Sequence, residues 1–183
     1  DPPRCDDPAR GPTSRDEATR YNEATSYNEA TSRDDRHGDA AVSGEGGSVN
    51  APTDPLAGHR AWLDSGGRTG RRWSVSGAAM AGAQLAGADL SEVEFVDCDL
   101  SGADLREAAL LRAVLSGCVL TGARLDGARL VKAELDGVSA AQASLVGVDL
   151  TRAALSGTTL QGARLDRAFL CRADLTRADL RGA

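Results

Sequence analysis

The chain has 183 residues, of which only 3% are aromatic, whereas alanine and leucine supply most of the apolar content and 21 glycines accompany them. This composition excludes a conventional core built around aromatic side chains and favours a narrow core of small residues. The formal net charge is -6, with 10 basic and 13 acidic side chains in residues 1–73 and 11 and 14 in residues 74–183, so bulk charge does not favour nucleic-acid binding.

Other global features bear on cellular location. No apolar run approaches the roughly 18 residues of a membrane helix, and no secretion signal opens the chain. Because the first residue is Asp1 rather than Met, the sequence is also compatible with a fragment that lacks its natural start. The four cysteines match neither a zinc motif nor a disulfide framework, which favours a reducing compartment and a cytoplasmic location. They are Cys5, Cys98, Cys118 and Cys171.

Residues 1–53 are rich in Asp, Arg, Thr, Ser, Pro and Gly, and a hexad repeat runs through residues 15–32. Such a segment cannot bury enough apolar surface to offset the entropy lost on ordering. We therefore predict a disordered low-complexity tail. The alternative is a short linear motif at the Tyr-Asn-Glu-Ala-Thr units of the repeat.

Residues 54–73 open with a helix signal, since Asp54 suits the N-cap, Pro55 the first helical position and the pair Gly66-Gly67 the end. One face of this helix would carry Leu56, His59, Trp62 and Leu63. We predict a capping helix and linker that cover the open end of the following repeat. His59 has no second His or Cys nearby, so a structural role is favoured over a ligand or base.

From residue 75 onward every fifth position is apolar through Leu180, with Ala140 the weakest member, and the register holds over 22 consecutive units. A period of five fits neither ordinary element, because successive leucines would advance by about 140° around a helix and would alternate between the faces of a strand. The chain must therefore turn once per unit. This predicts a solenoid whose successive coils pair backbone to backbone, about 4.8 Å apart.

The units Ala88-Asp89-Leu90-Ser91-Glu92, Ala103-Asp104-Leu105-Arg106-Glu107 and Ala173-Asp174-Leu175-Thr176-Arg177 resemble those of the pentapeptide-repeat family. The resemblance covers residues 74–183 without a break and implies an all-β fold, a right-handed quadrilateral β-helix with four units per coil and about five and a half coils. The segment from His59 to Gly70 looks like leader sequences found ahead of such repeats.

Variation at the small position gives an independent indication of a 20-residue coil. Cys98, Cys118, Val138 and Thr158 depart from alanine at intervals of 20, whereas the position of Ala83 and Ala103 stays alanine throughout. We therefore predict that Cys98 and Cys118 stack on adjacent coils as buried free thiols. Cys171, one residue after a central leucine, is expected to face water.

Residues 74–183 contain no histidine, no phosphate-binding glycine loop and no zinc-ligand cysteine pair. The sequence therefore predicts no catalytic, cofactor-binding or metal-binding residues, and hence no enzyme. The aspartates that precede central leucines are better interpreted as surface or turn-bonding groups than as paired catalytic carboxylates. They include Asp89, Asp99, Asp104, Asp149, Asp174 and Asp179.

At the outward position two residues after the central leucine, a 20-residue spacing aligns Arg112, Lys132, Arg152 and Arg172 into a predicted basic ladder. One interpretation is that these side chains fan apart in solvent and are balanced by Asp149 and other carboxylates. The functional alternative is an anion-recognising stripe for an acidic protein surface or a nucleic-acid backbone. Charge is unevenly distributed along the repeat: residues 89–107 carry seven acids and one Arg, whereas residues 152–181 carry six Arg and three Asp.

These observations predict a non-enzymatic protein-interaction scaffold that presents a rigid surface. The expected partner is another protein rather than nucleic acid, and an end-to-end homodimer is compatible with the repeat. By resemblance, a DNA-mimic modulator of DNA gyrase is an alternative, although the repeat has a net charge of only -3, no loop interrupts the coils and no C-terminal dimerisation helix follows. The other alternative is a structural spacer within a longer polypeptide.

Overall fold

The computed structural model describes residues 54–183, so the tail predicted for residues 1–53 lies outside the described residues. Helix α2 spans Pro55–Asp64. Its N-cap Asp54 accepts a hydrogen bond from the Leu56 N–H, and Pro55 occupies the first turn, where its missing N–H costs nothing. The helix ends at Asp64, two residues before Gly66, and Ser65 is its C-cap.

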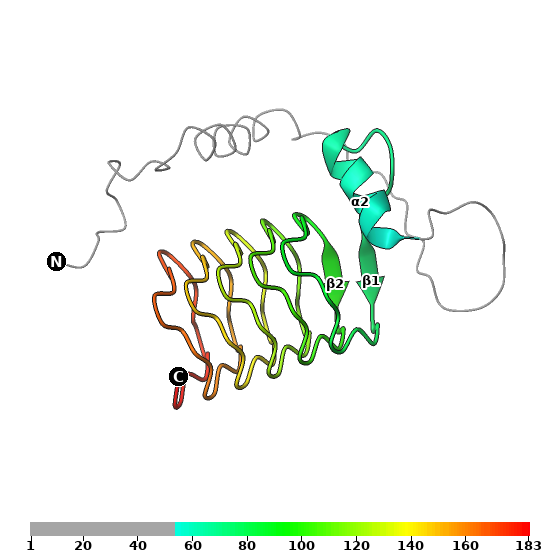
Figure 1. Cartoon of the computed structure of the whole chain (residues 1–183). Helices are drawn as coiled ribbons and strands as arrows, with labels where there is room; N and C mark the ends of the chain where they lie inside the picture. Colours follow the sequence, from blue (N-terminus) through cyan, green and yellow to red (C-terminus); the bar gives the residue numbers. More distant parts are fainter. Residues whose placement is uncertain (1–53) are drawn as a thin grey trace. The chain divides into compact units, whose positions relative to one another are not determined.

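The repeat forms parallel coils whose equivalent residues lie 20 positions apart. Strands β1 (Ser74–Ser76) and β2 (Glu94–Val96) pair in parallel with Val75 opposite Phe95. Single-residue bridges continue this register on every side, as far as Thr159 opposite Asp179. Figure 1 shows the coils stacked one behind another from β1 toward the C-terminus.

Each coil turns at four corners, one per five-residue unit. At a typical corner the Leu120 carbonyl accepts a hydrogen bond of 3.0 Å from the Ala123 N–H, and Gly122 between them has φ 66°. A hydrogen-bonded turn with a left-handed third residue has the geometry of a type II turn. Because turns recur every five residues, each side retains room for only one bridging residue, which explains why just two strands of three residues are present in residues 54–183.

The core is a stack of leucines and alanines. The central leucines of the inner coils, from Leu90 to Leu160, are at most 5% exposed, and the small residues between them are equally buried. Ala140 occupies a central position as predicted from the pattern, and a cavity inside the stack is lined by neighbouring leucines together with Val138, Ala140 and Thr158. In the last coil Leu165, Leu170 and Leu175 are only partly buried.

The interior column that departs from alanine supplies side-chain donors to the preceding coil. Cys98 and Cys118 are free and buried, as predicted. The Cys118 Sγ donates to the Phe95 carbonyl at 3.2 Å, and the Thr158 Oγ1 donates to the Leu135 carbonyl at 2.8 Å. Burial raises the pKa of the Cys118 thiol to about 11, so this thiol stays protonated. Cys171 is half-buried rather than fully exposed, and it is disulfide-bonded rather than a free thiol.

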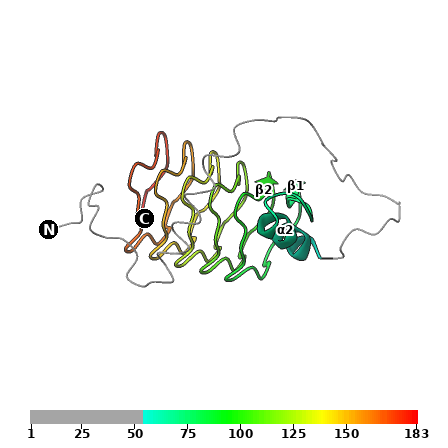
Figure 2. The ribbon, with the colours of Figure 1, turned by 90° about the horizontal axis from the view of Figure 1, so that it is seen from above.

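Helix α2 contacts the first coils through His59, which is fully buried. Its Nδ1 accepts a hydrogen bond of 3.1 Å from the Trp73 N–H, while its Nε2 lies 3.0 Å from the Ser91 carbonyl oxygen, to which it must donate. Both nitrogens are therefore satisfied only in the neutral Nε2–H tautomer. This pairing confirms the structural role predicted for His59, and Figure 2 shows α2 beside β1 at the first coil.

Candidate interaction surface

The backbone places the four predicted ladder residues in one column. Bridges 20 residues apart flank the column on both sides, joining Arg129 to Asp149 and Glu134 to Ala154. Between them the Lys132 N–H donates to the Thr151 carbonyl at 3.0 Å, and the Arg152 N–H donates to the Cys171 carbonyl at 2.9 Å. The ladder therefore comprises the corner residues Arg112, Lys132, Arg152 and Arg172 on four successive coils.

All four ladder residues have left-handed backbone conformations, with φ between 55° and 60°. This conformation costs a non-glycine residue about 1 kcal/mol or more. Glycine occupies 12 of the 22 corners, and five of the ten exceptions belong to this single column, which begins with Glu92. The 20-residue spacing predicted the column but not this conformational cost. The absence of glycine from positions 92, 112, 132, 152 and 172 is the sequence signal that could have indicated it.

The charge surroundings of the ladder agree only in part with the interpretation that Asp149 and other carboxylates balance it. The Asp149 carboxylate accepts a hydrogen bond of 3.0 Å from the Thr151 N–H and makes no ion pair with a ladder residue within residues 54–183. The carboxylate beside the ladder is instead Glu92, whose Oε1 lies 4.0 Å from the Arg112 Nη1. Lys132 and Arg152 occupy adjacent coils, and neither forms an ion pair with a carboxylate of residues 54–183. The middle of the ladder therefore carries two adjacent positive charges without a carboxylate partner in this part of the chain.

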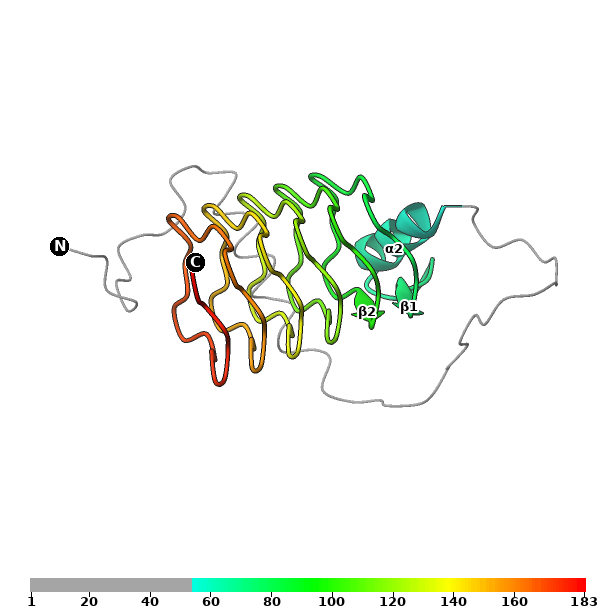
Figure 3. The same ribbon diagram turned by 90° about the horizontal axis from the view of Figure 1, so that it is seen from below.

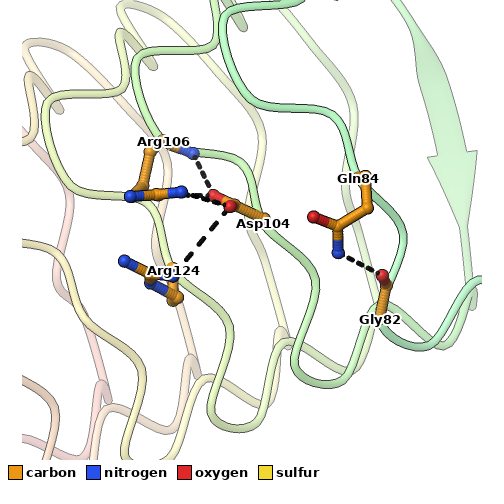
Figure 4. A network of polar contacts seen from close by, with 5 residues as sticks. All are labelled: Gly82, Gln84, Asp104, Arg106 and Arg124. Carbon is orange, nitrogen blue, oxygen red and sulfur yellow. Dashed lines mark hydrogen bonds and ion pairs between the residues drawn. The ribbon is translucent and has the colours of Figure 1, made fainter.

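Cations on a neighbouring side of the coil are paired within the repeat. Figure 4 shows Arg106 and Arg124 turned toward Asp104. The Arg106 Nε and Nη2 donate to the two Asp104 carboxylate oxygens at 2.7 and 2.6 Å, and the Arg124 Nη1 lies 4.0 Å from Asp104 Oδ2. The bidentate Arg106 contact is the main cause that lowers the pKa of Asp104 to about 2. Within the described part of the chain, both cations of this network therefore have a carboxylate within 4.0 Å, unlike Lys132 and Arg152.

The aspartates that precede central leucines accept hydrogen bonds from the turns that follow them, as predicted. Each accepts a hydrogen bond from the backbone N–H two residues later, at distances between 2.9 and 3.3 Å; they are Asp89, Asp99, Asp104, Asp149, Asp174 and Asp179. At Asp179 the additional side-chain hydrogen bonds from Arg181 are the largest cause that lowers the pKa to about 2. In all six units the carboxylate therefore helps to hold the backbone of the turn.

Two further properties concern only the part of the chain that the structure describes. In residues 54–183, His, Cys, Asp and Glu side chains do not gather in a group of three or more that could hold a metal ion. No helix in the same range has the length and apolar character needed to cross a membrane.

Several solved structures resemble this chain. A trypsin-treated form of QnrB1, described as a plasmid-mediated fluoroquinolone resistance protein, is 22% identical over 57% of this chain, with a TM-score of 0.48. The match covers 62% of that QnrB1 chain, which is less than two thirds of its length. The pentapeptide repeat protein Rfr23 from the cyanobacterium Cyanothece 51142 is 24% identical, with 58% and 83% of the two chains covered and a TM-score of 0.28.

HetL, a pentapeptide repeat protein involved in heterocyst differentiation regulation in Nostoc sp. strain PCC 7120, is 28% identical. That match covers 62% of this chain and 75% of HetL, with a TM-score of 0.20. A comparison with curated protein sequences gave no match. The sequence profile of the pentapeptide repeat region matches residues 79–182, which is more than half of the chain. Because this segment contains the repeating turns and 20-residue coils described above, the chain belongs to the pentapeptide repeat family.

Proposed function

We propose that this protein is a non-enzymatic scaffold whose repeat presents fixed rows of side chains to another protein. The observation that carries the proposal is the pair Lys132 and Arg152, which stand on adjacent hydrogen-bonded coils without an ion pair in residues 54–183. Like charges held this close repel each other, so an anionic partner would relieve the repulsion as well as add its own contacts. A rigid backbone also reduces the entropy lost on binding.

The interior of the repeat supports a binding role over catalysis. Enzymes commonly use a concave pocket that brings a few polar groups together. Here the cavity inside the coils is lined by apolar side chains and Thr158, whose hydroxyl is already bonded to the Leu135 carbonyl. The function therefore belongs to the outer surface.

Helix α2 has a structural part in this proposal, as a cap on the first coil. Leu56 and Trp73 pack against the core, and the Trp73 ring meets Phe95 edge-on with 4.9 Å between ring centroids. Covering the first coil would shield its backbone edge from pairing with other chains. Under this proposal residues 54–73 form the cap and linker, and residues 74–183 form the binding surface.

Affinity capture with the full-length chain tests the proposal. The test variant is Lys132→Glu with Arg152→Glu, and the matched control is Arg167→Glu with Arg177→Glu. The control makes the same charge change at corner residues whose φ values are 58° and 60°, but in other columns. We expect a protein partner that is retained by the unaltered chain and by the control but is lost from the test variant.

A structural spacer is the alternative function, and it predicts that no partner depends on Lys132 and Arg152. Modulation of DNA gyrase rests on the family resemblance alone, and a supercoiling assay with the full chain tests it separately. Inhibition or protection of gyrase that persists in the test variant would favour that alternative over the ladder.

A further inference from the structure

The ladder borders a row of apolar and small side chains on the same side of the coil. Leu111 and Val131 immediately precede Arg112 and Lys132 and are partly exposed. The next row across is mixed, because Arg129 and Asp149 stand between Ala109, which is partly exposed, and Phe169, which is 51% exposed. A ligand lying over this side would therefore contact aliphatic surface beside Arg112 and Lys132.

Acidic side chains limit the width of the positive surface. The row that follows the ladder contains Glu94, Glu134 and Asp174, and the bridges place these residues on alternate coils. Across the apolar row lies Asp149. A polyanion with charge on every side, such as a nucleic-acid duplex, would meet these carboxylates together with the cations. A ligand with one narrow row of negative charge would avoid them.

The spacing of the ladder distinguishes between extended and helical ligands. With about 4.8 Å between coils, the four cations stand at about 0, 4.8, 9.6 and 14.4 Å along the stack. An α-helix rises 1.5 Å per residue, so carboxylates at positions i, i+3, i+7 and i+10 stand at about 0, 4.5, 10.5 and 15.0 Å. Each carboxylate position agrees with the corresponding cation position within about 1 Å. Alternate residues of an extended strand are about 6.8 Å apart, so a strand is out of register by about 6 Å at the fourth cation.

We infer that the surface formed by Leu111, Val131 and the ladder binds an acidic amphipathic α-helix of a partner protein, with the helix axis along the coil stack. This inference rests on the proposed function and names the class of its partner. The helix places one row of carboxylates over Arg112, Lys132, Arg152 and Arg172, and its neighbouring apolar positions over Leu111 and Val131. Long Lys and Arg side chains adjust their tips to differences of about 1 Å, so the match in rise is sufficient.

A synthetic helical peptide provides the direct test with the full-length chain. The patterned peptide carries Glu at i, i+3, i+7 and i+10 with Leu on the adjoining face, and circular dichroism checks that it is helical. The comparison peptide has the same composition and helicity, but its Glu residues are distributed around the helix. By fluorescence anisotropy we expect the patterned peptide to bind at least about tenfold more tightly, with affinity falling as salt rises.

Matched variants separate the ladder from general charge. Lys132→Glu with Arg152→Glu should weaken binding of the patterned peptide by at least about tenfold, whereas Arg167→Glu with Arg177→Glu should leave it nearly unchanged. Leu111→Ser with Val131→Ser should also weaken binding, because the apolar edge is lost. Equal binding of the two peptides, equal loss in both charge variants, or tighter binding of a duplex oligonucleotide would overturn the inference.

Failure of the inference can be told apart from failure of the proposed function. If a captured partner depends on Lys132 and Arg152 but the patterned peptide has no advantage, the scaffold stands and the helical ligand is wrong. If the full-length chain captures no ladder-dependent partner, the proposed function itself is wrong.

Discussion

At the scale of single residues, neighbours in the sequence have opposite surroundings. Leu130 is fully buried, whereas Arg129 beside it is exposed. Replacing Leu130 by Lys would bury an ammonium among leucines without a counter-charge, which costs several kcal/mol, of the order of a domain's whole stability. Arg129→Lys should change stability by less than about 0.5 kcal/mol. Urea unfolding of both variants checks this, and equal shifts would contradict the inward orientation of Leu130.

Ala140 is a position where a substitution is expected to stabilise the fold. It occupies a central position that is otherwise Met or Leu in its column, and the neighbouring Leu135 and Leu145 are 4% and 5% exposed, slightly more than most inner leucines. Ala140→Leu restores the pattern beside the internal cavity and should stabilise the fold by about 1–2 kcal/mol through added apolar burial. A rise in the urea midpoint is expected. A lower midpoint would mean that the coil has closed around the alanine and is overpacked by leucine.

At the scale of elements, the junction between α2 and the first coils depends on a neutral His59. Burial lowers the pKa of His59 below its ordinary value of 6.5, against the opposing effects of the Ser91 carbonyl, Asp89 and Glu92, while Arg72 adds to the lowering. Protonation would also place a hydrogen on Nδ1, which faces the Trp73 N–H.

The sign of the pH dependence follows from this lowered pKa. Because the unfolded chain binds the His59 proton more readily, stability should be full above about pH 6.5 and should fall as the pH drops below that value. Urea unfolding at pH 7.5 and 5.5 measures the change. In His59→Gln the fold should be weaker, but its stability should vary less between the two pH values. The same pH dependence in both proteins would exclude His59 as the cause.

Much of this element-level description could be predicted because the signals are local. Asp54 and Pro55 mark the start of α2, and the five-residue period marks every turn. The contacts of His59 could not be predicted, since Trp73 and Ser91 are brought to it only by the packing of the helix on the coil. The side-chain hydrogen bonds of Cys118 and Thr158 could not be predicted for the same reason, because each is donated to a carbonyl 23 residues earlier in the chain.

The ladder shows the same division between predictable and unpredictable features. Its column follows from four five-residue units per coil, and the same rule places Glu92 below Arg112, which sequence reasoning did not use. That Asp149 bonds to the Thr151 backbone instead of a ladder cation depends on the turn geometry. A count of charges in the sequence cannot tell whether Asp149 bonds to the backbone or pairs with a ladder cation.

At the scale of the whole repeat, sequence order becomes position along the stack, as Figure 3 shows by the progression of colour from α2 to the last coil. The acid-rich residues 89–107 therefore lie in the first coils, and the arginine-rich residues 152–181 lie in the last. Such a charge gradient would orient an approaching charged partner before contact. The gradient and the ladder both require one coil for every 20 residues.

Backbone proton contacts in solution test that requirement most directly. In a nuclear Overhauser spectrum of the full-length chain, we predict contacts between Arg129 and Asp149 and between Glu134 and Ala154, the bridged pairs on either side of Lys132 and Arg152. These contacts would place Lys132 and Arg152 one above the other in a single column. Systematic contacts between residues 15 or 25 apart would put the four cations at different corners and contradict the account.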